Sequence, residues 1–370
     1  MITLYHDAIH LLKSLIAIES FSKQEEGTAD RIESFFAERS ISFQRHLNNV
    51  WARNRHYDPG KPTILLNSHH DTVRPNSGWT RDPFMPVGEA GKLYGLGSND
   101  AGGALVSLIA TFLHFYQRTD LSFNLVVAAT AEEENSGRNG IEAAWPRLGR
   151  IDLAIVGEPT EMQLAIAEKG LLVLDCLARG ISGHAARDTG VNAIEKAIEA
   201  INWFHSYRFE KESALLGPVK MTVTMIEAGT QHNVIPDQCR FTVDVRTTDA
   251  YDNLAVLEEI RARVDCEVTP RSTRLNPSGI SPDHPIARAA QAIGMGRFGS
   301  PTTSDQAVIP APSVKLGPGQ SERSHTADEF IFLEEVAQGI KRYIELLETL
   351  NLGNLKNFAT EAQSSQRTDN

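Results

Sequence analysis

The stretch LLNSHHD, residues 65–71, brings two histidines and an aspartate to the end of an apolar run. An imidazole with a carboxylate two residues further on suits a metal ligand and the group that orients it. In that arrangement His69 binds an ion through one ring nitrogen, and Asp71 accepts the N–H of the other. A polar turn after a strand is the alternative, and it is at least as common for an isolated pair of this kind. The other candidate ligands must decide between the two interpretations.

A second candidate ligand, Asp100, lies in GLGSNDAGG just before a long apolar segment. A carboxylate at this point could bridge two cations, and the two glycines that follow allow close approach of the backbone. The alternative is that Asp100 caps the N-terminus of the following helix. The segment is not a dinucleotide fingerprint, because the third glycine of GxGxxG would fall at position 100.

Glutamates follow two other apolar runs. The run at 123–130 leads into three glutamates at 132–134, and the run at 153–156 leads into Glu158. Adjacent glutamates are usually a solvated surface turn, and this alternative stays open for the fragment taken alone. Their position directly after predicted buried strands favours a functional role.

One more candidate, His325, follows a short apolar run at 314–316 and a turn, although a lone histidine there could simply be solvated. Taken together, five residues each follow or flank the end of a predicted strand: His69, Asp100, Glu134, Glu158 and His325. Residues that converge on one rim of a parallel sheet would show this placement. Two histidines with three carboxylates suit zinc, and one bridging carboxylate would allow a pair of ions.

Buried strands that precede the candidate ligands must position these residues. We also predict three amphipathic helices, which lie in the first 20 residues, at 25–40 and at 333–350. From Ile166 the pattern changes to a βαββαβ unit, which is the order of a ferredoxin-like domain. Its predicted elements are strand 168–180, helix 192–206, strands 219–229 and 238–248, helix 253–264 and strand 266–271. More helix and strand follow, so the smaller domain is inserted into the larger one.

We therefore predict an α/β catalytic domain with a mostly parallel central sheet, formed by residues 1–167 and 277–352. The inserted α+β ferredoxin-like domain is placed at 168–276. A chain of 370 residues exceeds what one hydrophobic core usually serves, which agrees with two domains. Residues 353–370 are polar, and we predict a disordered tail there.

Composition narrows the class of protein. Hydrophobic residues at 41% and charged residues at 22% fit an ordinary globular protein. A net charge of -11 argues against nucleic acid as a partner. The three cysteines form no CxxC, which indicates free thiols and a cytoplasmic location. No apolar run reaches the roughly 18 residues of a membrane span, and the N-terminus resembles an amphipathic helix rather than a signal peptide.

A set of short motifs carries a family resemblance. The motifs LLNSHHDTV, GLGSNDAGG, AEEENSGRNG, VGEPT, GHAA, HNVIP and SHTADE occur in this order across nearly the whole chain. Together with the inserted domain, they resemble the dinuclear zinc amidohydrolases and peptidases that include acetylornithine deacetylase, succinyl-diaminopimelate desuccinylase, aminoacylase and the glutamate carboxypeptidases. Any one motif is weak, but the ordered set is specific.

The resemblance implies a ligand set for two Zn²⁺ ions, which Co²⁺ can replace. One ion would be held by His69, Asp100 and Glu158, and the other by Asp100, Glu134 and His325. Asp71 would orient His69. The family usually has DEE where this chain has three glutamates at 132–134, and the following NSGRNG sets the register of these three positions.

Catalytic roles also follow from the resemblance. Glu133 would be the general base, which takes a proton from the attacking water and hands it to the leaving amine. His184 in GISGHAARD would donate to the oxyanion of the tetrahedral intermediate. Asn233 and Arg246 match positions that hold the substrate carboxylate, and arginine makes a bidentate contact that lysine cannot. A turn residue and a strand-edge surface residue remain alternatives for these two.

The leading functional hypothesis is hydrolysis of the amide bond of an N-acyl amino acid. The chain most resembles the acetylornithine deacetylase branch, which implies N-acetyl or N-succinyl derivatives of ornithine or citrulline in arginine biosynthesis. The alternatives are a succinyl-diaminopimelate desuccinylase, a dipeptidase or carboxypeptidase, and a catalytically silent binding protein of the same fold. Silent relatives should lack ligands or the base, and none is missing in this sequence.

The inserted domain is predicted to form a homodimer. A βαββαβ unit leaves an edge strand that can pair with a twofold-related copy. The resemblance further places His184 in the active site of the partner subunit.

Overall fold

The structure is a computed structural model that describes residues 2–187 and 189–351. The prediction of a disordered tail at 353–370 therefore lies outside the described residues. Among the helices of the described part, none combines the length and apolar character needed to cross a bilayer.

The chain forms two compact units. The described residues of the first are 2–166, 280–298 and 304–351, and those of the second are 167–187, 189–279 and 299–303. The first unit is thus interrupted by the second, and the short segment at 299–303 also groups with the second unit.

A mixed sheet forms the centre of the first unit. Its strands are β1 (Phe43–His46), β2 (Asn49–Arg53), β6 (Asn124–Thr130), β3 (Thr63–His69), β7 (Leu153–Gly157), β17 (Ser313–Leu316) and β8 (Leu164–Glu168), in this spatial order. The four strands β6, β3, β7 and β17 are parallel to one another, whereas β1, β2 and β8 are antiparallel to their neighbours. Two short strands, β15 (Ser278–Gly279) and β16 (Arg297–Ser300), pair with β8. The predicted α/β fold with a mostly parallel centre is confirmed.

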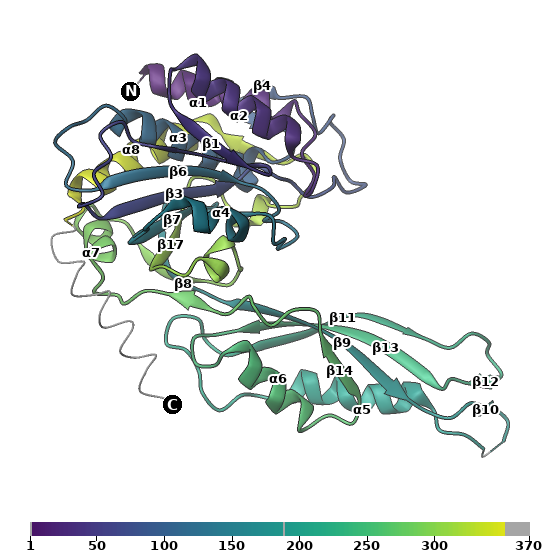
Figure 1. Ribbon diagram of the computed structural model, residues 1–370. Coiled ribbons are helices and arrows are strands. Elements are labelled where there is room, and N and C mark those ends of the chain that lie inside the picture. Colours follow the sequence, from purple (N-terminus) through teal and green to yellow (C-terminus); the bar gives the residue numbers. More distant parts are fainter. Residues whose placement is uncertain (1, 188, 352–370) are drawn as a thin grey trace. The chain divides into compact units, whose positions relative to one another are not determined.

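Helices cover both faces of this sheet (Figure 1). Because successive strand residues point to opposite faces, Ile64 and Leu66 pack into one apolar core and Leu65 into the other. The larger core includes α1 (Ile2–Ile16), α2 (Glu26–Glu38), α3 (Gly103–Phe115), α7 (Pro285–Ala292) and α8 (Leu333–Thr349). The smaller core includes α4 (Ile141–Leu148). The helices predicted at 25–40 and 333–350 are confirmed as α2 and α8.

The parallel strands bring their carboxyl ends to one rim, where α/β proteins usually carry their functional groups. Strand β3 ends at His69 itself, β6 ends just before the acidic residues at 132–134, and β7 ends just before Glu158. All residues of these three strands are buried. The rim is therefore built on buried strands.

Two smaller features complete the surroundings of the rim. Asp100 lies in a turn, η1 (Ser98–Gly102), which precedes α3, and its own backbone is not helical, with a φ of -116° and a ψ of 98°. Its side chain does not cap α3, which starts after Gly102, so the alternative of a helix cap is wrong. A three-stranded antiparallel sheet contacts this turn through its strand β18. Its strands are β4 (Val87–Glu89), β5 (Lys92–Tyr94) and β18 (Phe330–Phe332). Two 3₁₀ turns, η2 (Asp305–Val308) and η3 (Ser321–Arg323), flank β17.

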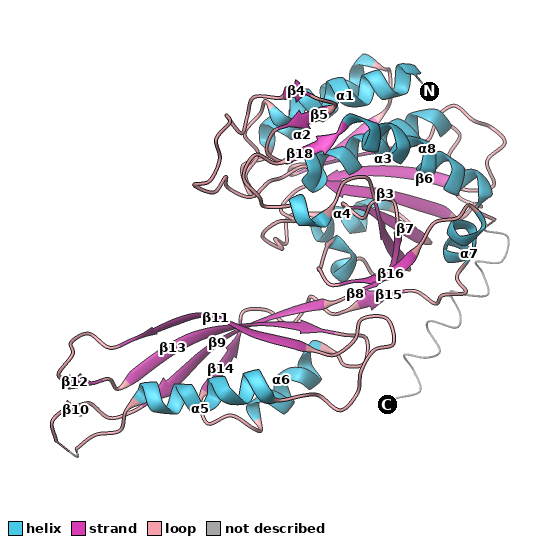
Figure 2. Cartoon of the chain, turned by 180° about the vertical axis from the view of Figure 1, so that it is seen from behind, coloured by secondary structure: helices cyan, strands magenta, loops and turns pink. Residues whose placement is uncertain are grey.

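The second unit is an antiparallel sheet with helices on one face, as Figure 2 shows. Its strands lie in the order β11 (Lys220–Ala228), β13 (Gln238–Thr247), β9 (Gly170–Arg179) and β14 (Glu267–Pro270). Helices α5 (Ala193–Ser206) and α6 (Asn253–Arg261) share an apolar core with the sheet. A separate pair, β10 (Gly183–His184) and β12 (Val234–Ile235), is antiparallel. The βαββαβ order predicted from the sequence is confirmed.

Candidate metal centre

His69 lies at the centre of the candidate site and is 1% exposed. Its Nδ1 lies 3.0 Å from the backbone carbonyl oxygen of Asp71. Because a carbonyl only accepts, Nδ1–H must donate this bond, and the lone pair of the neutral ring is then on Nε2. Nε2 is buried and has no hydrogen-bond partner among the described residues. A buried imidazole nitrogen without a hydrogen-bond partner fits a metal ligand.

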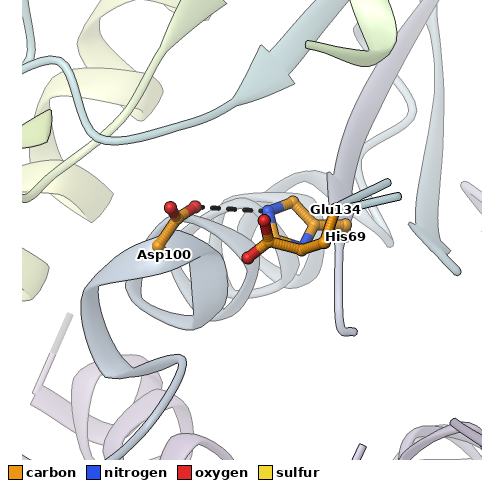
Figure 3. A group of neighbouring side chains, drawn as sticks. All are labelled: His69, Asp100 and Glu134. Carbon is orange, nitrogen blue, oxygen red and sulfur yellow. Dashed lines mark ion pairs between the residues drawn. The ribbon is translucent and has the colours of Figure 1, made fainter. Parts of the chain in front are cut away.

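Carboxylate oxygens surround this nitrogen. From His69 Nε2 the nearest oxygens are those of Asp100 at 3.4 Å, Glu158 at 3.8 Å and Glu133 at 4.0 Å. Figure 3 shows His69, Asp100 and Glu134 converging, with a dashed line for the ion pair between His69 and Asp100. In two overlapping groups, His69 with Asp100 and Glu134 and His69 with Glu133 and Glu158, one ligand atom per residue lies within 4.8 Å of the others. Both groups have the donor types that bind divalent cations.

Asp100 lies between two imidazoles. Its Oδ1 faces His69 Nε2 at 3.4 Å, and its Oδ2 faces His325 Nε2 at 3.5 Å. His325 Nε2 also lies 2.9 Å from Oε2 of Glu134. The structure thus brings together all five candidate ligands that the sequence singles out, although His325 comes from a distant segment. The two oxygens of one carboxylate point toward two different groups of donors, which is the geometry that a bridging ligand needs.

The acidic turn after β6 separates its three glutamates. Glu132 has a positive φ of 55°. Its carboxylate accepts a hydrogen bond of 2.9 Å from the side chain of Asn139, away from the histidines. Glu133 and Glu134 instead face His69 and His325. This geometry favours the register in which Glu133 and Glu134, rather than Glu132, serve the site.

Asp71 organises that turn more directly than the sequence suggests. We expected its carboxylate to accept the N–H of His69, but the backbone carbonyl takes that bond and the nearest carboxylate oxygen lies 3.5 Å from Nδ1. The carboxylate accepts from Ser22 Oγ at 2.7 Å and from the backbone N–H groups of Glu133 at 3.0 Å and Glu134 at 3.2 Å. Asp71 therefore connects the end of β3 to the two glutamates after β6.

Burial and the crowding of charged groups shift the pKa values of the carboxyl and imidazole groups at this site. Burial raises the pKa of Glu133 well above its ordinary value, and it raises the pKa of Glu158 to about 8, with Asp100 adding to the second shift. The contact with Glu134 raises the pKa of His325 to about 9. Burial would lower the pKa of His69, but Asp100 and Asp71 raise it well above its usual range. Groups with raised pKa values hold protons that a divalent cation would displace on binding.

Three buried carboxyl groups that the sequence motifs do not reveal support the rim. Glu25 accepts from the backbone N–H of Glu132 at 3.3 Å, and Asp305 accepts from Asn67 at 2.8 Å and from Thr130 at 3.0 Å. The third is Glu329. Each contact joins segments far apart in the chain, so no local spacing in the sequence could have revealed them.

The three candidates of the second unit do not gather at one place. His184 on β10 is opposite Val234 on β12, and the N–H of Ala185 donates to the carbonyl of Asn233 at 3.0 Å, so His184 and Asn233 are neighbours. Arg246 lies near the other end of β13, where its guanidinium pairs with both carboxylate oxygens of Asp244, at 2.8 and 3.0 Å. The arginine is thus held by a carboxylate in the same strand.

Nitrogen and carboxylate donors that converge at the carboxyl edge of an α/β sheet are the donor types with which metal-dependent hydrolases bind divalent cations. The chain belongs to peptidase family M20/M25/M40, whose profile matches residues 65–349. It is an amidohydrolase, as the named relatives of the family indicate.

Relatives with assigned names share much of the chain. An acetylornithine deacetylase of Pectobacterium carotovorum subsp. carotovorum (strain PC1) is 32% identical over 298 residues, which cover 74% of this chain and 76% of the relative. A succinyl-diaminopimelate desuccinylase of Stenotrophomonas maltophilia (strain R551-3) is 27% identical over 331 residues, covering 82% and 87%. The crystal structure of a dinuclear metal-binding M20 peptidase of Bacillus subtilis has the same fold, with a TM-score of 0.70, 17% identity and coverage of 94% and 98%.

Metal uptake should release protons at neutral pH. Glu158, with a pKa of about 8, and His325, with a pKa of about 9, hold protons that a cation must displace before their lone pairs can bind it. We expect the apparent affinity for Zn²⁺ or Co²⁺ to increase from about pH 6 to about pH 9. Calorimetry in two buffers with different ionisation enthalpies counts the protons released.

The same groups determine how the free energy of unfolding of the metal-free protein changes with pH. Between the ordinary carboxyl pKa of 4.5 and about 8, folded Glu158 retains a proton that the unfolded chain has lost. The free energy of unfolding should therefore decrease as pH rises through this interval.

For metal binding, uptake that is independent of pH and releases no proton would contradict the assignment of Glu158 and His325 as ligands.

Proposed function

We propose that the protein hydrolyses the amide bond of an N-acyl amino acid in a reaction that depends on divalent metal ions. N-acetylornithine, or a related N-acetyl or N-succinyl derivative of ornithine or citrulline in arginine biosynthesis, is the proposed substrate. The observation that carries this proposal is the convergence of two imidazoles and four carboxylates on one rim, with Asp100 between the imidazoles. The 32% identity to an acetylornithine deacetylase supports the choice of substrate.

The proposed ions are two Zn²⁺, which Co²⁺ can replace. His69, Asp100 and Glu158 would hold one ion, and Asp100, Glu134 and His325 the other. The distances from Asp100 to the two histidines, 3.4 and 3.5 Å, support a bridging role for its carboxylate. Imidazole nitrogen and carboxylate oxygen are ligands that zinc accepts.

Glu133 is the proposed general base. When bound, the ions would supply Lewis acidity to the amide carbonyl and to the attacking water. Glu133 would accept a proton from that water as its oxygen attacks the carbonyl carbon, and would then donate the proton to the nitrogen of the leaving amine.

The second unit is proposed to supply substrate contacts from a homodimer. Asn233 lies just before β12, whereas Arg246 is eight residues beyond Gln238, the first residue of β13. Eight residues of extended strand span roughly 26 Å, so one chain cannot place both side chains on one small carboxylate. A substrate held by Arg246 of one subunit would meet His184 and Asn233 of the other. The exposed Met225 and Ile226 on edge strand β11 support pairing with a second copy.

A cytoplasmic location is part of the same proposal. The three cysteines, Cys176, Cys239 and Cys266, form no disulfide, as expected for a reducing compartment.

A substrate panel tests the proposed function. We expect the Zn²⁺- or Co²⁺-loaded protein to hydrolyse N-acetylornithine, N-acetylcitrulline or N-succinylornithine with a higher kcat/KM than N-succinyl-diaminopimelate or dipeptides. A preference for N-succinyl-diaminopimelate would instead support the desuccinylase alternative, for which the 27% identity to such an enzyme is the favouring observation. No hydrolysis of any of these substrates by metal-loaded protein would refute the proposal and favour a silent binding protein.

Glu133→Gln and Glu134→Gln should separate catalysis from metal binding. A neutral amide cannot accept the proton, so Glu133→Gln should retain both ions and lose turnover by on the order of 100-fold or more. Glu134→Gln should bind metal more weakly, because a charged ligand is lost. Metal analysis beside kinetics distinguishes the two variants. The opposite pattern would mean that the register of the acidic turn is shifted by one residue.

Mixing two inactive variants tests the role of His184 across the dimer. Glu133→Ala and His184→Ala are each expected to be inactive, but a mixed dimer would contain one site with both residues intact. Random reassociation should therefore restore on the order of a quarter of wild-type activity. If His184 serves its own chain, or if the protein is a monomer, every site lacks one residue and the mixture stays inactive.

A further inference from the structure

Glu329 is a buried carboxyl group that no proposed ligand set includes. It is 2% exposed and lies between His325 and strand β18. Its carboxylate accepts three backbone N–H groups, those of Gly97 at 3.1 Å, Asn99 at 2.7 Å and Asp100 at 3.0 Å. All three donors belong to the turn that carries Asp100. The side chain thus fills an anion-binding concavity made by the backbone of this turn.

Other hydrogen bonds hold parts of this turn, such as those from the N–H of Ser98 to the carbonyl of Gly95 at 3.1 Å and from the N–H of Gly102 to the carbonyl of Gly97 at 3.0 Å. Gly97 has a φ of 73°, and the Asp100 side chain is occupied with the two histidines. The side chain of Asn99 exchanges two hydrogen bonds with the backbone of Gln320, at 2.9 and 3.1 Å. Three N–H groups that point at one place need an acceptor, because a buried N–H without a partner destabilises the folded state. Glu329 satisfies all three at once.

Glu329 also lies on the segment that carries His325. Glu329 is four residues beyond His325 in the sequence, and its carboxylate accepts a hydrogen bond from the Asp100 turn. Its backbone carbonyl accepts from the N–H of Gly95 at 3.0 Å. One short segment therefore connects a histidine and an aspartate whose nearest atoms are 3.5 Å apart. A change in this anchor would alter the distance between these two side chains directly.

Glu329 is almost fully buried and lies beside a second carboxyl group, that of Asp100. A carboxylate that is held only by neutral amides near another carboxylate is costly to bury. The cost is offset if a cation binds on the far side of Asp100.

We propose that Glu329 is the positioning residue for Asp100, which fixes the turn at 97–100 relative to His325 so that both side chains can hold the same ion. This inference rests on the proposed metal-dependent function. Glu329 does not touch the ions or the substrate in this scheme. It acts through the backbone of the ligand turn.

The neighbouring residue provides a matched control. Asp328 is also a carboxylate that accepts backbone N–H groups, from Thr80 at 3.0 Å and Arg81 at 2.9 Å, but these belong to a loop without candidate ligands. Asp328→Asn and Glu329→Gln therefore make the same chemical change at adjacent positions. Only the second affects the Asp100 turn.

The experiment compares metal affinity in the full-length wild type, Glu329→Gln and Asp328→Asn. After removal of metal, Zn²⁺ binding is measured by competition with a chromophoric chelator, and Co²⁺ loading is followed by its visible absorption spectrum. A glutamine has one acceptor oxygen and an NH₂ group that would oppose the N–H donors. We expect Glu329→Gln to weaken binding on the order of 10- to 100-fold and to change the Co²⁺ spectrum. Asp328→Asn should match the wild type in both.

Each outcome decides the inference. Wild-type affinity and spectrum in Glu329→Gln would overturn it, as would an equal loss in Asp328→Asn, since that would indicate general destabilisation. If Glu329→Gln does not fold, Glu329→Asp decides, because it keeps the charge but is too short to reach all three N–H groups. Weaker Zn²⁺ binding by folded Glu329→Asp supports the inference, and wild-type binding overturns it. A wild-type protein that takes up no ion would overturn the proposed function itself.

Discussion

Mutual repulsion among carboxylates is the constraint on which the rest of the first unit depends. Asp71, Asp100, Glu133, Glu134 and Glu158 gather around one buried imidazole. Like charges at these separations oppose one another strongly where water is excluded. The repulsion arises because the sheet places the carboxyl ends of buried parallel strands side by side. The arrangement has a physical rationale if a divalent cation neutralises it.

The carboxyl groups near the rim divide into two kinds by what they contact. Those of Asp100, Glu133, Glu134 and Glu158 face the imidazoles. A second kind, which includes Asp71 and Glu329, accepts backbone N–H groups of the turns that carry the first kind. Backbone amides hold these carboxylates, and the hydroxyl of Ser22 also donates to Asp71.

The second unit poses a different geometric problem. Its βαββαβ core is regular, and its candidate residues lie at two ends of the same sheet. Arg246 already has a carboxylate partner in Asp244, so an incoming carboxylate must compete with it or share the guanidinium. A dimer in which each subunit contributes one end of its sheet would reconcile this separation with a small substrate.

Local patterns in the sequence determined the elements and the types of ligand. Alternating and continuous apolar runs predict β3, β6 and β7, and the polar residues that follow them are those that reach the rim. The βαββαβ order of the second unit follows from the same local signals. Such features depend on neighbours within a few residues, which is why sequence alone specifies them.

Only the tertiary structure decided which atoms meet. Three sets of hydrogen bonds join residues that local periodicity does not relate. They are the bond between Glu132 and Asn139, the two bonds that Asp71 accepts from the acidic turn, and the three bonds that Glu329 accepts from the Asp100 turn. Their partners are set by the packing of strands and turns around the sheet, since a hydrogen bond requires a distance of about 3 Å and a direction that spacing along the chain does not encode.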